Sequence, residues 1–165
     1  MFTYRLIVEY DGAGFSGWQS QPETRTVQGE LERALAVVTR QPIALQGASR
    51  TDAGVHATGQ AASFACEGEI EPRKLVTGVS ALCRPDAAVV AAGRAPDGFN
   101  ARFASKGKRY RYRILNRPAP SPLFAGIAWH VTGALDAAAM QDAAARLVGT
   151  HDFAGFRSAD CGREN

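Results

Sequence analysis

Residues 50–60 (RTDAGVHATGQ) place Asp52 in a polar stretch that is bounded by apolar ones. A carboxylate in such a loop can act as a covalent nucleophile or as a general base. It can also cap a turn through its side chain, with Gly54 supplying a positive φ. One Asp and one His four residues apart do not make a metal site, and no nucleophile elbow surrounds Ser49. The residue types therefore leave Asp52 either a catalytic or a turn-forming role.

A second candidate group lies in residues 99–116 (FNARFASKGKRYRYRILN). From residue 99 to 134 the chain has no acidic residue and seven basic ones, whereas the remaining 12 basic and 16 acidic residues leave a charge of −4. The seven are Arg102, Lys106, Lys108, Arg109, Arg111, Arg113 and Arg117. Phosphates bind Arg and Lys, and unstacked bases stack on rings such as those of Tyr110 and Tyr112. The stretch predicts a nucleic-acid site or the solvated face of a strand, and the two are compatible.

A third pattern, formed by Gly12, Gly14 and Gly17, has the GxGxxG spacing of a dinucleotide-binding turn. That turn must open a helix whose N-terminus receives the pyrophosphate. No helical pattern begins before Val27. We therefore interpret the glycines as a turn rather than as a nucleotide site, which leaves Trp18 without an explanation.

Length and composition restrict the class of protein. The chain has 165 residues, enough for one domain or two small ones, with 45% hydrophobic residues and a net charge of +3. No apolar run approaches the roughly 20 residues of a membrane span, and the N-terminus lacks the pattern of a secretory signal. The three cysteines, Cys66, Cys83 and Cys161, form no CxxC pair. We therefore expect a reduced, cytoplasmic protein without a membrane segment or a metal site.

Hydrophobic periodicity predicts the elements that position these residues. Strands are expected at 2–11, 59–66, 87–95, 106–116 and 127–131. Three helices are expected, and the last of them lies at 135–148. The first helix is capped by Thr26 and carries an apolar stripe of Val27, Leu31, Ala34, Leu35 and Val38. The second opens at Pro72 and carries a stripe of Leu75, Val76, Val79, Leu82 and Cys83.

The order of these elements predicts an α+β fold class with two ferredoxin-like, RRM-like units, each an antiparallel sheet with helices on one face. The first unit is expected at 1–97 and contains the loop with Asp52. The second is expected at 106–165, and its first strand alternates arginines with tyrosines, so that one face is basic and the other aromatic. Two strands and one helix leave sheet edges that a complete unit would pair or cover, so we expect this unit to be incomplete.

Five segments, in order along the chain, carry a family resemblance. They are YDGAGFSGWQSQ at 10–21, TVQGELERAL at 26–35, RTDAGVHATGQ at 50–60, FNARFAS with KRYRY at 99–112, and GTHDFAGF at 149–156. Together they resemble the tRNA pseudouridine synthase I family, whose members modify uridines at positions 38 to 40 in the anticodon stem-loop of tRNA. The matches span nearly the whole chain.

The resemblance implies an isomerase that breaks the N-glycosidic bond of a uridine, turns the base and reattaches it through C5, without a cofactor or metal. Asp52 takes the position of the catalytic aspartate, as a nucleophile or in proton transfer. Arg50 matches the arginine that helps to extrude the uridine, and Tyr110 matches the tyrosine that stacks on the target base. The tRNA backbone would be held by Arg102, Lys106, Lys108, Arg109 and Arg111. The resemblance also implies a homodimer that takes tRNA across both subunits.

Two departures from the family pattern bear on the site. Asn100 stands where a His or an Asp is expected, which affects turn or phosphate contacts there. Family members also continue well past the HDF segment, into a part that includes an arginine paired with the catalytic aspartate and an apolar residue of the uracil pocket. A noncatalytic RNA-binding module is the alternative interpretation, in which Asp52 has only a turn role.

Overall fold

The computed structural model describes residues 1–156, and the chain divides into two compact units after Tyr110. The first unit, residues 1–110, contains a four-stranded sheet, and the second, from Arg111 onward, contains a two-stranded sheet. The fold class is α+β, as the sequence predicts. The expected domain limits of 1–97 and 106–165 stay predictions.

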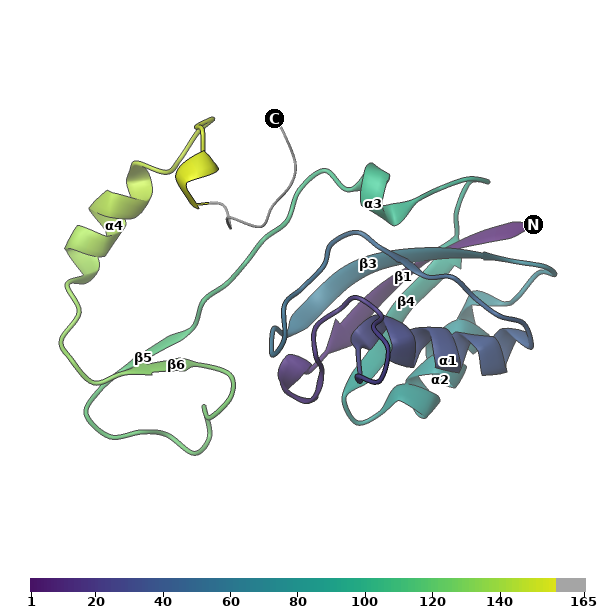
Figure 1. The fold of residues 1–165 in the computed structure, drawn as a ribbon, viewed down its shortest axis with the longest axis horizontal. Helices are drawn as coiled ribbons and strands as arrows, with labels where there is room; N and C mark the ends of the chain where they lie inside the picture. Colours follow the sequence, from purple (N-terminus) through teal and green to yellow (C-terminus); the bar gives the residue numbers. More distant parts are fainter. Residues whose placement is uncertain (157–165) are drawn as a thin grey trace. The chain divides into compact units, whose positions relative to one another are not determined.

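The first unit has the ferredoxin-like order of strands and helices. Along the chain its main elements are β1 (Phe2–Tyr10), α1 (Val27–Thr39), β2 (Gln46–Gly47), β3 (Ala57–Cys66), α2 (Pro72–Cys83) and β4 (Ala87–Arg94). All strand pairs are antiparallel, and the order across the sheet is β2-β3-β1-β4. Figure 1 shows α1 and α2 together on one face of this sheet. β1 is thus a central strand with a partner on each side.

Alternation along β1 determines which side chains of the strand enter the core. Tyr4, Leu6, Val8 and Tyr10 are each at most 3% exposed, whereas the intervening Arg5 is exposed. The helices contribute Leu31, Leu35, Leu75 and Val79 to the same core. Each large apolar side chain buried in this way contributes about 2 kcal/mol to stability. The strand predicted at 2–11 is confirmed over Phe2–Tyr10.

The helices α1 and α2 begin where the sequence predicts. Thr26 caps α1, because its side-chain oxygen accepts a hydrogen bond from the Gly29 amide at 3.3 Å. Pro72 opens α2 at a position where a missing N–H costs nothing. The predicted stripe of α2 is wrong at Leu82, which is 48% exposed. Leu82 lies at the edge of the stripe, about 20° around the helix from the buried Leu75, in the last turn of α2.

The second unit differs from expectation in its strands. They are β5 (Ile114–Asn116) and β6 (Trp129–Val131), and they pair in parallel rather than antiparallel. The predicted strand at 106–116 is wrong over 106–113, which Figure 1 shows as an irregular connection that leads from α3 (Ala101–Ala104) to β5. A strand needs a neighbour for its backbone hydrogen bonds, and no described strand pairs with this stretch. The predicted basic and aromatic faces therefore do not form.

The helix of the second unit is shorter than predicted. α4 spans Ala137–Ala145 instead of 135–148, and it is capped by Asp136, whose side chain accepts a hydrogen bond from the Ala139 amide at 2.9 Å. None of residues 111–156 is buried. The described part of this unit therefore has no hydrophobic core, and its predicted incompleteness stays a prediction.

Two of the three cysteines are described, and both Cys66 and Cys83 are buried free thiols. Cys161 lies outside the described residues. Burial, and to a lesser extent the charge of Glu30, raises the pKa of the Cys83 thiol from 9.0 to about 11. Within residues 1–156 no helix is long and apolar enough to cross a membrane.

The Cys83 thiol predicts a pH dependence of stability. Above pH 9 the unfolded chain loses this proton, while the folded chain keeps it to about pH 11, so the free energy of unfolding falls as the pH rises through this window. A difference of about two pKa units corresponds to roughly 3 kcal/mol. We expect urea unfolding to show a shallower fall in Cys83→Ala than in the wild-type chain, by up to that amount. Equal pH slopes would contradict a protonated, buried thiol.

Candidate active site

Asp52 lies in a tight turn before β3, and the main chain makes this turn. The Val55 amide donates to the Asp52 carbonyl at 3.2 Å, and Gly54 has a φ of 79°, which favours glycine. The Asp52 side chain is exposed, and no hydrogen bond or ion pair engages its carboxylate among residues 1–156. The Asp52 turn, residues 51–55, therefore forms without the side-chain cap that the alternative interpretation assigns to Asp52.

The glycine segment, residues 12–17, packs against the Asp52 turn with main chain against main chain. An added Cβ on Gly12 would lie 2.1 Å from one carbonyl oxygen of the turn, and one on Gly17 would lie 2.8 Å from another. Gly17 also has a φ of 90°. The segment contains a single 3-10 turn, and the next helix begins only at Val27, so it does not form a dinucleotide-binding turn. Its glycines instead allow two loops to touch.

Trp18, which the sequence left unexplained, contacts both the Asp52 turn and the sheet. Its amide donates to the Thr51 carbonyl at 2.9 Å, and its side chain is only 2% exposed. The indole ring lies against Gly47 of β2, where an added Cβ would come within 2.5 Å of ring atoms. Only a glycine at position 47 therefore leaves room for the indole ring. Through this contact Trp18 connects the glycine segment to the edge of the sheet.

His56 joins the beginning of the glycine segment to the end of the Asp52 turn. Its Nδ1 atom is 3.3 Å from the Gly12 amide nitrogen and 3.0 Å from Asp11 Oδ1. A neutral ring can accept from Gly12 at Nδ1, and a protonated ring can pair with Asp11 instead, so both forms keep the two loops together. Among the residues that the structure describes, no three His, Cys, Asp or Glu side chains are grouped to hold a metal ion.

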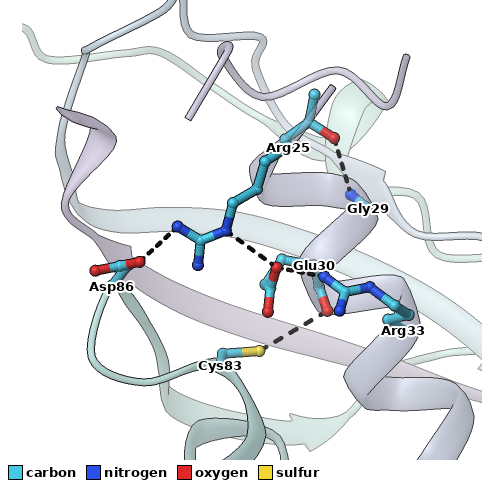
Figure 2. A network of polar contacts seen from close by, with 7 residues as sticks. Arg25, Gly29, Glu30, Arg33, Cys83 and Asp86 are labelled. Carbon is cyan, nitrogen blue, oxygen red and sulfur yellow. Dashed lines mark hydrogen bonds and ion pairs between the residues drawn. The ribbon is translucent and has the colours of Figure 1, made fainter. Parts of the chain in front are cut away.

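A network of charges holds the glycine segment at its other end (Figure 2). The Arg25 guanidinium donates to Asp86 Oδ2 at 2.6 Å and to Glu30 Oε2 at 3.4 Å. It also lies 4.3 Å from the centre of the Phe15 ring, which belongs to the glycine segment. The hydrogen bond with Asp86, followed by the charge of Glu30, raises the pKa of Arg25. The network therefore connects the glycine segment to α1 and to the residue just before β4.

Polar side chains from the sheet reach the same loop from β1 and β3. The Tyr10 hydroxyl is 2.8 Å from Thr51 Oγ1, and Gln60 Nε2 donates to the Ser49 carbonyl at 2.6 Å. Tyr10 and Gln60 are 3% and 8% exposed. The Tyr110 hydroxyl lies 3.5 Å from Ser49 Oγ, at the outer limit for a hydrogen bond. The structure thus places Tyr110 beside the loop that carries the candidate carboxylate.

Three of the residues singled out from the sequence, Arg50, Asp52 and Tyr110, therefore lie in one region of the first unit. Arg50 and Asp52 are exposed in one loop, and neither forms an ion pair with a described residue. The sequence patterns missed Tyr10 and Gln60, which contact this loop from the sheet. Gln60 offered a signal, because a long amide side chain among the mostly small residues of β3 must find a hydrogen-bonding partner if it is buried.

Most cations of the basic stretch have no acidic partner within the described part of the chain. Those that are exposed and form no ion pair among residues 1–156 include Lys106, Lys108, Arg109, Arg111 and Arg113. Arg117 donates to the Ala119 and Pro120 carbonyls, and Arg102 lies 5.9 Å from the centre of the Phe103 ring. Their charges are available to an anionic partner.

Asn100 preserves the turn contact that its departure from the family pattern put in question. Its Oδ1 atom accepts a hydrogen bond from the Arg102 amide at 2.9 Å, at the start of α3. An Asp in this position would accept the same bond. Relative to an Asp, the substitution therefore removes a negative charge and keeps the cap.

Comparison with known proteins identifies relatives of the chain. Residues 6–104 match the family model described as tRNA pseudouridine synthase. The protein named tRNA pseudouridine synthase A of Geobacter sulfurreducens is 48% identical over 161 residues, which cover 98% of this chain and 66% of the relative. Its namesakes in Parvibaculum lavamentivorans and Beijerinckia indica subsp. indica are each 48% identical over 162 residues, covering 98% of this chain and 66% and 62% of the relatives. The chain spans 62–66% of the length of these three curated relatives.

The contact between the two loops predicts that position 12 does not tolerate a side chain. In Gly12→Ala the new Cβ would lie 2.1 Å from the Val55 carbonyl oxygen, a main-chain atom that cannot move without shifting the Asp52 turn. We expect the free energy of unfolding to fall by about 3 kcal/mol in urea denaturation.

Gly93→Ala is the matched control, because no described atom lies within 4 Å of a Cβ added there. Its stability should stay within about 1 kcal/mol of the wild-type value. If Gly12→Ala proved as stable as Gly93→Ala, the close packing of the two loops would be refuted.

Proposed function

Because the chain belongs to the tRNA pseudouridine synthase family, we propose that it takes part in converting uridine to pseudouridine in tRNA, with Asp52 as the catalytic carboxylate. The observation that carries this role is the state of the Asp52 side chain. It is exposed and has no partner among residues 1–156, on a turn that neighbouring segments hold in place. An aspartate with a purely structural role would be expected to bond to its turn or to a cation.

The proposed reaction exchanges one glycosidic bond for another. The bond between uracil N1 and ribose C1′ breaks, the base turns, and a bond forms between C5 and C1′. The hydrogen on C5 leaves as a proton and N1 gains a proton, so that substrate and product are isomers and no oxidant or reductant is needed. An unpaired carboxylate can serve by attacking the ribose or the base covalently, or by accepting a proton as a general base.

Arg50 and Tyr110 are the residues proposed to handle the uridine. Removing a base from the stack costs a few kcal/mol, which new contacts must offset. Arg50, exposed and close to Asp52 in sequence, can occupy the space that the base leaves. Tyr110 is 57% exposed and offers a ring on which the extruded base can stack.

The tRNA backbone is proposed to bind the exposed side chains of Arg102, Lys106, Lys108, Arg109 and Arg111. Cations without acidic neighbours retain their full attraction for phosphates. The family resemblance supports three further proposals: that the targets are uridines 38 to 40 of the anticodon stem-loop, that the protein works as a homodimer, and that it acts in the cytoplasm. The free thiols of Cys66 and Cys83 fit a reducing compartment.

The proposed chemistry predicts that tritium is released from tRNA labelled at uridine C5, because the new bond expels that hydrogen. We expect release with the 165-residue chain. Asp52→Asn removes the charge of the carboxylate and keeps its shape, so it should lower kcat by a factor of about 10²–10⁴. Its tRNA binding, measured by fluorescence anisotropy, should stay within about twofold, since Asp52 is not among the phosphate-binding residues.

The same comparison distinguishes the enzyme from a noncatalytic RNA-binding module. If the folded chain binds tRNA and neither the wild-type protein nor Asp52→Asn releases tritium, the catalytic proposal is contradicted for this chain. If both release it at the same rate, Asp52 is not the catalytic group.

The unpaired cations predict a salt-dependent affinity for tRNA. Five phosphate contacts would give a slope of log affinity against log salt of about −0.7 for each, or roughly −3 to −4. Lys106→Ala should make the slope shallower by about 0.7. Lys74→Ala, which removes an exposed cation of α2, should leave it unchanged. A slope near zero in the wild-type chain would show that the stretch is only a solvated surface.

A further inference from the structure

We propose that Tyr10 is a positioning residue for this reaction: its buried hydroxyl fixes Thr51, and through Thr51 it sets the place of the neighbouring Asp52 carboxylate. The inference rests on the proposed catalytic role of Asp52 and adds the residue that aims it. In this role Tyr10 touches no substrate. It acts only through the main chain of the Asp52 turn.

Tyr10 is held rigidly by its place in the sheet. It is the last residue of β1 and pairs with Ala57 of β3 on one side and Ala87 of β4 on the other. The side chain is 3% exposed, and its ring centre lies 6.0 Å from that of Trp18. A ring anchored between two strands and packed in the core places its hydroxyl at a defined point, which a loop residue cannot do as well.

The Tyr10 hydroxyl is well suited to hold Thr51. Its distance of 2.8 Å from Thr51 Oγ1 is normal for two hydroxyl oxygens that share a hydrogen bond. Burial raises the pKa of Tyr10 above its usual 10.0, and the nearby Tyr110 adds to this, whereas hydrogen bonds with Thr51 and Gln60 oppose it. The phenol therefore keeps its proton at neutral pH and is able to donate it.

Other contacts hold the same stretch of main chain. The Trp18 amide donates to the Thr51 carbonyl at 2.9 Å, and Gln60 Nε2 donates to the Ser49 carbonyl at 2.6 Å. The backbone that leads into Asp52 is thus fixed at Ser49 and at both the side chain and the carbonyl of Thr51. A catalytic group must be held to within about 0.5 Å of its productive place, so these bonds matter for reaction as well as for stability.

Tyr4 offers a matched control at the other end of β1. It is 1% exposed, and its hydroxyl accepts a hydrogen bond from the Ile70 amide at 2.7 Å. Tyr4→Phe and Tyr10→Phe each remove one buried phenol hydroxyl from the same face of the same strand. Ile70 lies just before α2 and takes no part in the Asp52 turn. Both variants lose a structural hydrogen bond, but only Tyr10→Phe loosens the turn.

The kinetic test compares tritium release and tRNA binding by the 165-residue chain and the two variants, at a temperature where all are folded. We expect Tyr10→Phe to lower kcat about tenfold and to change KM and Kd for tRNA less than about twofold. Tyr4→Phe should leave all three near the wild-type values. Unchanged kcat in Tyr10→Phe, or an equal loss in Tyr4→Phe, would overturn the proposal.

A double variant tests whether Tyr10 acts through Thr51. Thr51→Val removes the other hydroxyl of the pair and should lower kcat as Tyr10→Phe does. The two changes combined should be no worse than either alone, because both break the same bond. Additive losses in the double variant would show that Tyr10 acts by another route.

Amide hydrogen exchange separates this inference from the proposed function. The Trp18 amide is bonded to the Thr51 carbonyl, so its exchange rate reports how firmly the Asp52 turn is held. Relative to amides within β1 of the same protein, we expect its exchange to be about tenfold faster in Tyr10→Phe than in Tyr4→Phe. If the wild-type chain releases no tritium, the proposed catalytic function fails, and hydrogen exchange alone then tests whether Tyr10 positions the Asp52 turn. Equal exchange rates of the Trp18 amide in the two variants would overturn that positioning role.

Discussion

The site depends on one contact, in which the main chain of the glycine segment touches the main chain of the Asp52 turn. No side chain fits between them, because a Cβ on Gly12 or Gly17 would lie 2.1 or 2.8 Å from a carbonyl oxygen. An exposed turn has no core of its own and takes its rigidity from whatever packs against it. Here that support continues to Trp18 at the sheet edge and to Arg25 beside Asp86. Packing of the backbone therefore sets the place of the Asp52 turn, and the carboxylate has no partner among residues 1–156.

Charges have opposite roles in the two parts of the chain that carry them. Around Arg25 each cation has carboxylate partners, and a guanidinium shared between Glu30 and Asp86 fixes how α1 and the start of β4 meet the glycine segment. Exposed ion pairs of this kind add little to the free energy of unfolding, so the main effect of this network is to orient the segments that it joins. Residues 106–113 carry like charges and have neither an acidic partner nor a strand partner among residues 1–156. The mutual repulsion of these cations opposes compact packing, and a bound polyanion would reduce that repulsion.

How far the sequence predicts the fold follows from how local each interaction is. Alternation in β1 and the apolar stripes of the two long helices follow burial residue by residue, so β1, α1, β3, α2 and β4 are predictable, whereas β2 and α3 are not predicted. Residues 109–113 alternate Arg and Tyr, but a strand also needs a partner backbone, and no local pattern shows whether one is present. The glycine segment is similar: its failure to open a helix could be read locally, whereas its contact with residues 51–55 joins positions about forty residues apart.

The residues of the candidate site divide in the same way. Asp52 could be picked out as a carboxylate in a polar loop, and Arg50 and Tyr110 through the family resemblance. Tyr10 could not, because in the alternation of β1 it is one more core residue, indistinguishable from Tyr4. Both tyrosines bury a hydroxyl that must find a partner. For Tyr4 that partner is a main-chain amide before a helix, and for Tyr10 it is the residue beside an unpaired carboxylate. Only the tertiary structure distinguishes a buried hydroxyl that stabilises the fold, as in Tyr4, from one that also contacts the loop of the candidate site, as in Tyr10.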